Sequence, residues 1–299
     1  MRKSIDNAII AAFAADALSL GVHWVYDTEA IAARYGRIEN FVTPELAPYH
    51  QGKKAGQLTH YGDQMLLLLE HVSDVGAFQA DSFSRSWQEM MRTYSGYLDQ
   101  ASKTTLTRLD RGLLPREAAS SSDDLSGAAR LAPLLAVYAH QPEQLAQAAM
   151  NQARLTHSSL VILATAELLA RSCTVVLQGV EPIDALTHAA RNVSDITVAD
   201  MVRRGIAAKD ENSVTAIKNF GQSCSVLGAL PSAVQLVARH GCDLRTALVE
   251  NVMAGGDSAA RGMFVATLIA AQPNVEIPQE WLERLRCLNE VKNLLQAIP

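Results

Sequence analysis

Almost the whole chain repeats apolar residues at helical spacing, and the alternation typical of strands is nearly absent. Apolar residues at i, i+3, i+4 and i+7 predict helices with one buried face. The 299 residues are 48% hydrophobic, which is enough for a large core, and no break in composition divides them. We therefore predict an all-α fold made of a single domain, residues 1–299.

Helices are expected over residues 4–20, 63–75, 80–99, 124–140, 142–152, 158–179, 182–193, 213–219, 224–240, 243–254, 258–271 and 278–297. Asp81 and Asp243 are expected to cap their helices, and Pro182 to occupy a first turn. The longest irregular region, 21–58, would be an unusually long loop for a compact domain, and such loops are usually functional or mobile.

Charge and cysteine usage exclude several classes of protein. The formal net charge of −5 argues against a general nucleic-acid binder. Cys173, Cys224, Cys242 and Cys287 lie far apart and match neither a zinc motif nor a disulfide framework. This usage is typical of a reducing compartment, so we expect a cytoplasmic protein.

Two apolar segments could be mistaken for membrane or export signals. The first, at the N-terminus, is interrupted by Asp6 and Asp16 and lacks a clear cleavage site, so we expect no signal peptide. The second, 158–179, carries Glu167 and Arg171 at i,i+4 spacing, which favours a buried helix over a membrane span.

Polar residues gather where loops run into helices, first in "AADALSLGVHWVYD". Asp16 falls late in an apolar helix, where a carboxylate is costly unless it is bonded or coordinated. His23 and Trp24 follow shortly after. Asp16 either bonds a neighbouring helix or belongs to a site, and His23 either packs in the core or faces that site.

The second cluster is "GQLTHYGDQM", which precedes a run of leucines. Asp63 can be read as the N-cap of that helix, with His60 and Tyr61 as loop residues. The alternative is that all three side chains form one wall of a site.

The third cluster is "SSSDDLSGAARLAPL", at the start of the expected helix 124–140. Free N–H groups around Ser126 and Gly127 could hold a phosphate or carboxylate of a ligand. Capping by Ser122 or Asp123 explains the same residues without a ligand.

The fourth cluster is "MAGGDSAARGMFVATLIAA". Two glycines, the second of them Gly256, allow a sharp turn before Asp257 and Ser258 begin a helix. Asp257 and Arg261 are spaced i,i+4 on an otherwise apolar helix. Because a buried arginine is normally paired, we expect this pair to face a polar cavity or a carboxylate.

In this order the four clusters resemble the motifs of the ADP-ribosylglycohydrolase family, which includes some lens crystallins. The family's G-D-A-L-G appears as "AADALSLG", its G-x-x-T-D-D-T-x-M/L as "GQLTHYGDQM", and its G-G-D-T-D-T as "GGDSAA". Further matches are "SGAARLAP", the "TH" that contains His157 before an alanine-rich helix, and the closing "IPQEWLERL". The resemblance covers nearly the whole chain.

The resemblance implies an all-α bundle with a cleft on one face. Typical members hold two magnesium ions through the T-D-D and D-x-D-T motifs. Those ions orient an ADP-ribosyl group and a water for cleavage of the anomeric bond, a role suited to hard cations with oxygen ligands.

The carry-over of these ligands is incomplete. When the motif is aligned on the pair Gln64 and Met65, its T-D-D-T positions hold His60, Tyr61, Gly62 and Asp63. In the last motif Asp257 and Ser258 match D-T, but two alanines replace the next D-T. Asp16 is retained, and His23 stands near the usual place of a further acidic residue.

Three interpretations of this pattern stay open. The Arg261 guanidinium, with His60, could replace the metal charge and neutralise Asp16, Asp63 or Asp257. A single transition-metal ion could be held by His23, His60 and two aspartates, since imidazole suits such ions better than magnesium. If any metal binds, the candidate ligands are Asp16, His60, Asp63 and Asp257. The site could also have drifted to a stable, inactive fold.

We expect a hydrolase that cleaves an N- or O-glycosidic bond of an ADP-ribosyl or related nucleotide-sugar substrate, without the dinuclear magnesium site. Asp63 or Asp257 would activate water or stabilise the transition state. His23 or His60 would act as general acid or base. The candidate substrate-binding residues are Asp16, Trp24, Tyr61, Ser126, Gly127, His157, Gly256, Ser258 and Arg261.

No cofactor is expected, and magnesium enters only through the resemblance. The alternatives are an inactive protein that binds ADP-ribose or a nucleotide, and a structural protein. Expected partners are a small-molecule or ADP-ribosylated substrate, without nucleic acid or membrane, and the chain would be a monomer or a small homo-oligomer.

Overall fold

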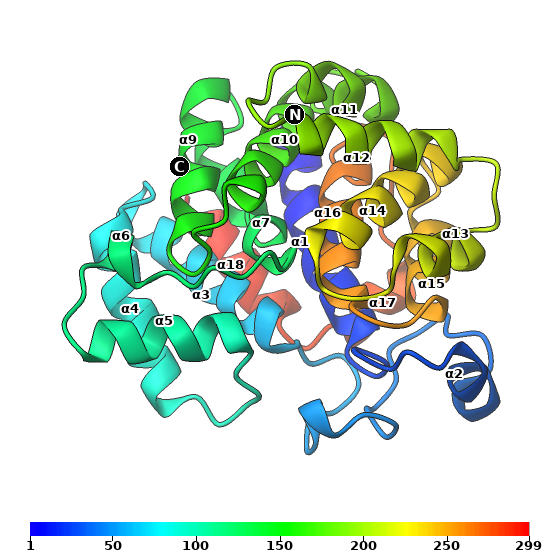
Figure 1. The fold of residues 1–299 in the computed structure, drawn as a ribbon, viewed down its shortest axis with the longest axis horizontal. Coiled ribbons are helices and arrows are strands. Elements are labelled where there is room, and N and C mark those ends of the chain that lie inside the picture. The colour runs from blue at the N-terminus through cyan, green and yellow to red at the C-terminus, as the bar shows by residue number, and fades with distance from the viewer. Residues whose placement is uncertain (299) are drawn as a thin grey trace.

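The computed structural model describes residues 1–298 and confirms the all-α fold class (Figure 1). Within these residues the backbone forms helices and three isolated bridges, and no strand longer than a bridge. None of the helices described there is both long and apolar enough to cross a bilayer. The apolar helix around Glu167 contains the expected ion pair, with Arg171 Nε at 2.8 Å.

The first half of the chain forms α1 (Arg2–Ser19), α2 (Thr28–Tyr35), the 3₁₀ turn η1 (Pro48–His50), α3 (His60–Val75), α4 (Ala80–Thr93), α5 (Gln100–Asp110), α6 (Pro115–Ala118), α7 (Ser126–Ala129), η2 (Ala132–Leu134), α8 (Leu135–Tyr138) and α9 (Pro142–Arg154). The second half forms α10 (Leu160–Val176), α11 (Pro182–Ala190), α12 (Ile196–Ala207), α13 (Ser213–Phe220), α14 (Val226–His240), α15 (Leu244–Met253), α16 (Ser258–Ile269), α17 (Gln279–Arg284) and α18 (Leu288–Ala297).

Helices α1 and α16 lie side by side through the centre of the molecule (Figure 1). Small residues face each other where the two helices meet. A Cβ on Gly262 would already be in van der Waals contact with the Ala15 Cβ, at 3.5 Å. The Ser19 hydroxyl donates to the Ser258 carbonyl at 3.0 Å and fixes their register. The end of α1 is therefore held against the start of α16.

Other helices surround this central pair. Helix α10 packs against α9 and α11, while α14 packs against α12, α13 and α16. On the other side α3 packs against α4, η2 and α18. The start of α3 thereby comes close to the junction of α1 and α16.

Several expected helix boundaries were wrong. The expected helix 124–140 is three short pieces, α7, η2 and α8, because Pro133 lacks the N–H that a continuous helix needs. The expected 278–297 is divided into α17 and α18, and 80–99 ends at Thr93. Helices α2, α5, α6 and α12 were missed, and α2 and η1 give structure to the loop 21–58.

The expected caps had mixed outcomes. Asp243 caps α15 by accepting from the Thr246 N–H at 3.0 Å, and Pro182 lies in the first turn of α11, as predicted. The prediction for Asp81 was wrong, since α4 begins at Ala80. Asp63 is not a cap either: α3 begins three residues earlier.

Candidate active site

A short backbone pairing joins the end of α1 to the start of α16. The Trp24 N–H donates to the Gly256 carbonyl at 2.8 Å, and the Gly256 N–H donates to the Val25 carbonyl at 2.7 Å. Gly256 has φ of 65°, and a Cβ there would lie 2.1 Å from the Gln222 carbonyl oxygen. Only glycine fits this position, which places His23 directly beside Asp257.

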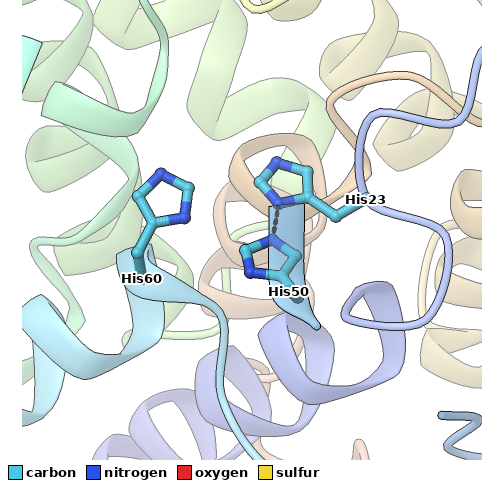
Figure 2. A group of neighbouring side chains, drawn as sticks. All are labelled: His23, His50 and His60. Atoms are coloured by element: carbon cyan, nitrogen blue, oxygen red, sulfur yellow. Dashed lines mark hydrogen bonds between the residues drawn. The ribbon is translucent and has the colours of Figure 1, made fainter. Parts of the chain in front are cut away.

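Three buried imidazoles converge at this junction (Figure 2). His23 follows α1, His50 ends η1, and His60 is the first residue of α3. His23 Nδ1 lies 2.9 Å from His50 Nε2, and one nitrogen of each ring lies within 4.8 Å of the others. Burial lowers the pKa of His60, and it lowers that of His50 far below its usual range.

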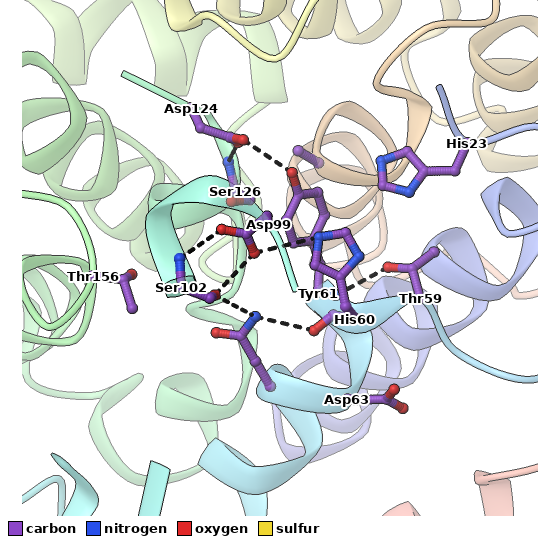
Figure 3. Close-up of polar contacts among 12 residues, drawn as sticks. His23, Thr59, His60, Tyr61, Asp63, Asp99, Ser102, Asp124, Ser126 and Thr156 are labelled. Atoms are coloured by element: carbon purple, nitrogen blue, oxygen red, sulfur yellow. Dashed lines mark hydrogen bonds and ion pairs between the residues drawn. The ribbon is translucent and has the colours of Figure 1, made fainter. Parts of the chain in front are cut away.

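A carboxylate lies next to each of two of these rings, and Figure 3 shows the one beside His60, which is Asp99. His23 Nε2 lies 3.1 Å from Asp257 Oδ1, and His60 Nε2 lies 3.4 Å from Asp99 Oδ2. Asp99 caps α5, accepting from the Ser102 N–H and hydroxyl. Burial raises the pKa of Asp99. The combined effect of His60 and the Ser102 N–H is larger and opposite, so the pKa is lowered and this carboxyl group stays ionised.

The Tyr61 hydroxyl lies between two carboxyl groups, those of Asp124 and Asp257. This buried hydroxyl donates to Asp124 Oδ2 at 2.9 Å and lies 3.4 Å from Asp257 Oδ2. Asp124, Asp257 and the half-buried Cys224 each place an oxygen or sulfur within 4.8 Å of the others. Asp257 therefore belongs to both groups, bonded to His23 on one side and close to Asp124 on the other.

The two paired carboxyl groups have opposite pKa shifts. Burial raises the pKa of Asp124 to about 7, and the charge of Asp257 raises it as well. Burial also acts on Asp257, but its contact with His23 outweighs that effect and lowers the pKa. At neutral pH the pair therefore offers one proton donor beside one carboxylate, a division typical of acid–base sites.

Asp16 holds the start of α3 in place through hydrogen bonds. It is fully buried and accepts from the Thr59 N–H at 2.7 Å and the Thr59 hydroxyl at 2.6 Å. Thr59 in turn caps α3, accepting from the Tyr61 N–H. Burial raises the pKa of Asp16 to about 6, against the opposing effect of the Thr59 bonds. Of the two possibilities for Asp16, the structure shows the bonding to a neighbouring helix.

Asp63 lies outside these groups. Its carboxylate takes the Lys53 ammonium at 2.5 Å and a short hydrogen bond from the Tyr94 hydroxyl. In Figure 3 its side chain points away from His60 and Tyr61. Of the four residues predicted to be catalytic, the structure brings together His23, His60 and Asp257, while Asp63 serves an ion pair.

Aromatic rings cover the imidazoles. Trp24, Tyr49 and Tyr97 contact one another edge to face, with ring centroids 4.9 to 5.2 Å apart. The Trp24 ring also lies 4.3 Å from His23 and 5.3 Å from His60. Trp24 has φ of 64°, a conformation that costs a bulky residue energy and is concentrated at functional sites.

The residues expected to bind a phosphate take part in internal contacts. The Ser126 N–H donates to Asp124 Oδ1 at 2.8 Å. A Cβ on Gly127 would lie 2.6 Å from His157 Nδ1, so this glycine allows the ring to pack against α7. His157 Nδ1 lies 2.9 Å from the Thr156 hydroxyl, and burial lowers its pKa to about 3.

Arg261 was expected to face a polar cavity or a carboxylate, but within residues 1–298 it pairs with no carboxylate. The guanidinium is fully buried, donating to Asn251 Oδ1 at 3.0 Å and to the Gly255 carbonyl at 2.6 Å. It therefore braces the turn before Asp257 and forms no ion pair with Asp16, Asp63 or Asp257, although its charge helps to lower the pKa of Asp257. The neighbouring Ser258 hydroxyl is also buried and has no hydrogen-bond partner.

Comparison with known proteins identifies the family. The family model described as ADP-ribosylglycohydrolase matches residues 2–298.

The chain belongs to the ADP-ribosylglycohydrolase family.

Individual relatives cover the chain almost completely. An uncharacterized protein of Archaeoglobus fulgidus is 27% identical over 96% of this chain and 92% of its own length. Crystallin J1A of Tripedalia cystophora is 25% identical over 95% of this chain and 92% of its own. A solved structure titled ADP-ribosylglycohydrolase-related protein complex has a TM-score of 0.78 at 23% identity, covering 99% and 97% of the two chains. This last likeness confirms the fold.

The magnesium pair implied for ADP-ribosylglycohydrolases does not fit the residues present. At the T-D-D-T positions Tyr61 supplies a phenol and Gly62 supplies no side chain, while Asp63 already holds the Lys53 ammonium. A Cβ on Gly62 would lie 2.2 Å from Asp16 Oδ2, so no aspartate fits there without rearrangement. Mg²⁺ requires oxygen ligands in octahedral geometry, and this wall of the site no longer offers them.

The other predicted ligand set does not form either. Within residues 1–298, two groups of side chains lie within reach of one ion: the three histidines, and Asp124 with Cys224 and Asp257. Asp16 and Asp63 belong to neither. Asp16, His60, Asp63 and Asp257 therefore do not meet at one point.

Four residues of the site were not predicted from the sequence, namely His50, Asp99, Asp124 and Cys224. Some signals existed. His50 lies in the long region 21–58, and Asp124 lies in the "SSSDD" cluster beside Ser126. Asp99 and Cys224 carried no local signal, because only tertiary packing brings them near His60 and Asp257.

Proposed function

We propose that this chain hydrolyses an N- or O-glycosidic bond of an ADP-ribosyl or related nucleotide-sugar substrate, and that it does so without a magnesium pair. Family membership supports the reaction class. The observation that carries the proposal is the buried pair Asp124 and Asp257, joined through the Tyr61 hydroxyl and shifted in opposite directions. Most glycosidases use two carboxyl groups in different protonation states for catalysis.

The pair divides the chemistry between an acid and a base. As the anomeric bond breaks, its electrons pass to the leaving nitrogen or oxygen, which takes the proton of the Asp124 carboxyl group. The Asp257 carboxylate stabilises the positive charge that develops on the sugar. Water then adds to the anomeric carbon and gives its proton to the Asp124 carboxylate, which restores the acid.

Neighbouring residues position this pair. His23 holds Asp257 at 3.1 Å, and the Ser126 N–H holds Asp124 at 2.8 Å. Asp257 is fully buried, and the Trp24 ring lies against the neighbouring His23, so the proposal requires side chains around Asp257 to move before a substrate reaches it. Exclusion of water from such a site strengthens the electrostatic effect of the carboxylate.

The test is ADP-ribose release from ADP-ribosyl-arginine, ADP-ribosyl-serine and small ADP-ribosyl glycosides. Wild type should release ADP-ribose from at least one of them, and Asp124→Asn should be slower by about 10²-fold or more. Asp123→Asn is the matched control, because the neighbouring carboxylate bonds only the Ser225 hydroxyl at 2.6 Å. Equal losses in both variants would count against an acid at Asp124.

The pH dependence provides a further prediction. Activity needs the protonated Asp124, whose pKa is about 7, so the rate should fall roughly tenfold for each pH unit above that value. Asp257, Asp99, Tyr61 and Cys224 face this carboxyl group. The lowered pKa values of Asp257 and Asp99 keep both carboxylates ionised down to pH 5, and burial raises the pKa of Tyr61 and of Cys224, so both stay neutral. The residual activity of Asp124→Asn should not decline at alkaline pH. If the decline persists in this variant, it belongs to another group.

A second candidate function is a binding or structural protein without turnover. The complete burial of His23 and Asp257 favours it, as does the likeness to Crystallin J1A. ADP-ribose should then raise the melting temperature without release from any substrate. A structural role alone predicts neither binding nor turnover.

A further inference from the structure

The three buried imidazoles have more ring nitrogens than hydrogen-bond partners. His23, His50 and His60 are at most 3% exposed. Between the rings there is one hydrogen bond, from His23 Nδ1 to His50 Nε2 or the reverse, at 2.9 Å. His50 Nδ1 and both nitrogens of His60 lack a well-aligned partner. Buried polar atoms are normally satisfied, so the His60 nitrogen that faces the other two rings needs a partner that the described residues do not supply.

The surroundings already orient two of the rings. A carboxylate behind a histidine fixes the tautomer and directs the opposite nitrogen towards a metal. Asp257 lies behind His23 in this way, at 3.1 Å from Nε2, which leaves Nδ1 to point at His50. Asp99 stands behind His60, at 3.4 Å from its Nε2, and is itself fixed by Ser102.

We propose that His23, His50 and His60 bind one zinc ion. Three imidazoles without a thiolate suit Zn²⁺, and they leave the fourth position of a tetrahedral site to water or a substrate oxygen. Two nitrogens on such an ion lie about 3.3 Å apart, given bonds of about 2.05 Å. The 2.9 Å pair must therefore open by a few tenths of an ångström, and His60, within 4.8 Å, must approach.

This site differs from the family's magnesium pair in donor type and in the residues that provide it. His50 comes from the loop between α1 and α3, outside the T-D-D-T and D-x-D-T segments. The proposal does not rest on the proposed hydrolysis, because an inactive protein could hold the same ion. Its tests therefore use binding and spectroscopy.

The first test titrates the full chain, stripped with EDTA, with Co²⁺ and then Zn²⁺. We expect one tight site per chain, a visible Co²⁺ spectrum of tetrahedral type, and its displacement by Zn²⁺. His50→Gln should weaken Zn²⁺ binding by about 100-fold or more. His71→Gln is the control, since this imidazole lies on the same helix as His60 and accepts from the Gln79 N–H.

Three results would overturn the proposal: no tight site in wild type, unchanged binding in His50→Gln, or loss of the site in Cys224→Ala. The last would place the ion at the group of Asp124, Cys224 and Asp257. If His50→Gln fails to fold, X-ray absorption on zinc-loaded wild type decides the question. Three imidazole nitrogens at about 2.0 Å support the proposal, and sulfur or oxygen-only coordination contradicts it.

Discussion

Asp257→Asn is expected to lower kcat/KM for ADP-ribose release by on the order of 10³-fold. The amide keeps the shape of the side chain and can still accept from the Ala260 N–H, so the cap of α16 should persist. The change removes the negative charge that would stabilise the transition state, together with the carboxylate that His23 Nε2 contacts at 3.1 Å. Steady-state kinetics on the best substrate of the panel measures the loss.

A matched control comes from the preceding helix. Asp243 caps α15 in the same manner as Asp257 caps α16, but it is exposed and remote from the imidazoles. Asp243→Asn should change kcat/KM less than twofold. A loss in Asp257→Asn that is no larger than this would remove Asp257 from the catalytic machinery.

Gly62→Ala is expected to lower the free energy of unfolding by about 2–3 kcal/mol. The added methyl group would lie 2.2 Å from Asp16 Oδ2 and 2.9 Å from the Leu58 Cβ, so the start of α3 must move away from α1. The melting temperature should fall by roughly 5–10 °C. Denaturant titration followed by circular dichroism gives the free energy.

A double variant distinguishes the steric clash between the new methyl group and Asp16 from a general effect of alanine on helix α3. Asp16→Ala leaves the Thr59 N–H and hydroxyl without acceptors and should itself cost about 2–4 kcal/mol. In Asp16→Ala with Gly62→Ala the new methyl group can occupy the vacated space. The combined loss should be smaller than the sum by about 1–2 kcal/mol. Strict additivity would show that Gly62 is not constrained by Asp16.

Local sequence patterns were sufficient for much of the fold. The spacing of apolar residues predicted helices over 4–20 and 258–271, and the structure places the corresponding α1 and α16 at the centre. Boundaries failed where a local signal had two readings. Asp63 has the chemistry of a cap, yet Thr59 takes that role because Asp16 holds it in place.

The site was predictable only where its residues belong to motifs. His23, His60 and Asp257 lie in segments that resemble the family pattern, and the structure brings them together. His50 and Asp124 are recruited by tertiary packing, from a loop and from the segment before α7, which no periodicity reveals. Arg261 had the right setting for an ion pair, but backbone carbonyls and Asn251 satisfy it instead.

The Asp124–Asp257 pair is proposed to support hydrolysis without two magnesium ions. The most direct test measures ADP-ribose release in magnesium-free buffer and again across added Mg²⁺ up to millimolar concentrations. We expect turnover in the absence of Mg²⁺ and a change of less than twofold on its addition, because Asp63 is held by Lys53 and no aspartate stands at position 62. Activity that appears only with Mg²⁺ and rises to saturation would contradict the claim.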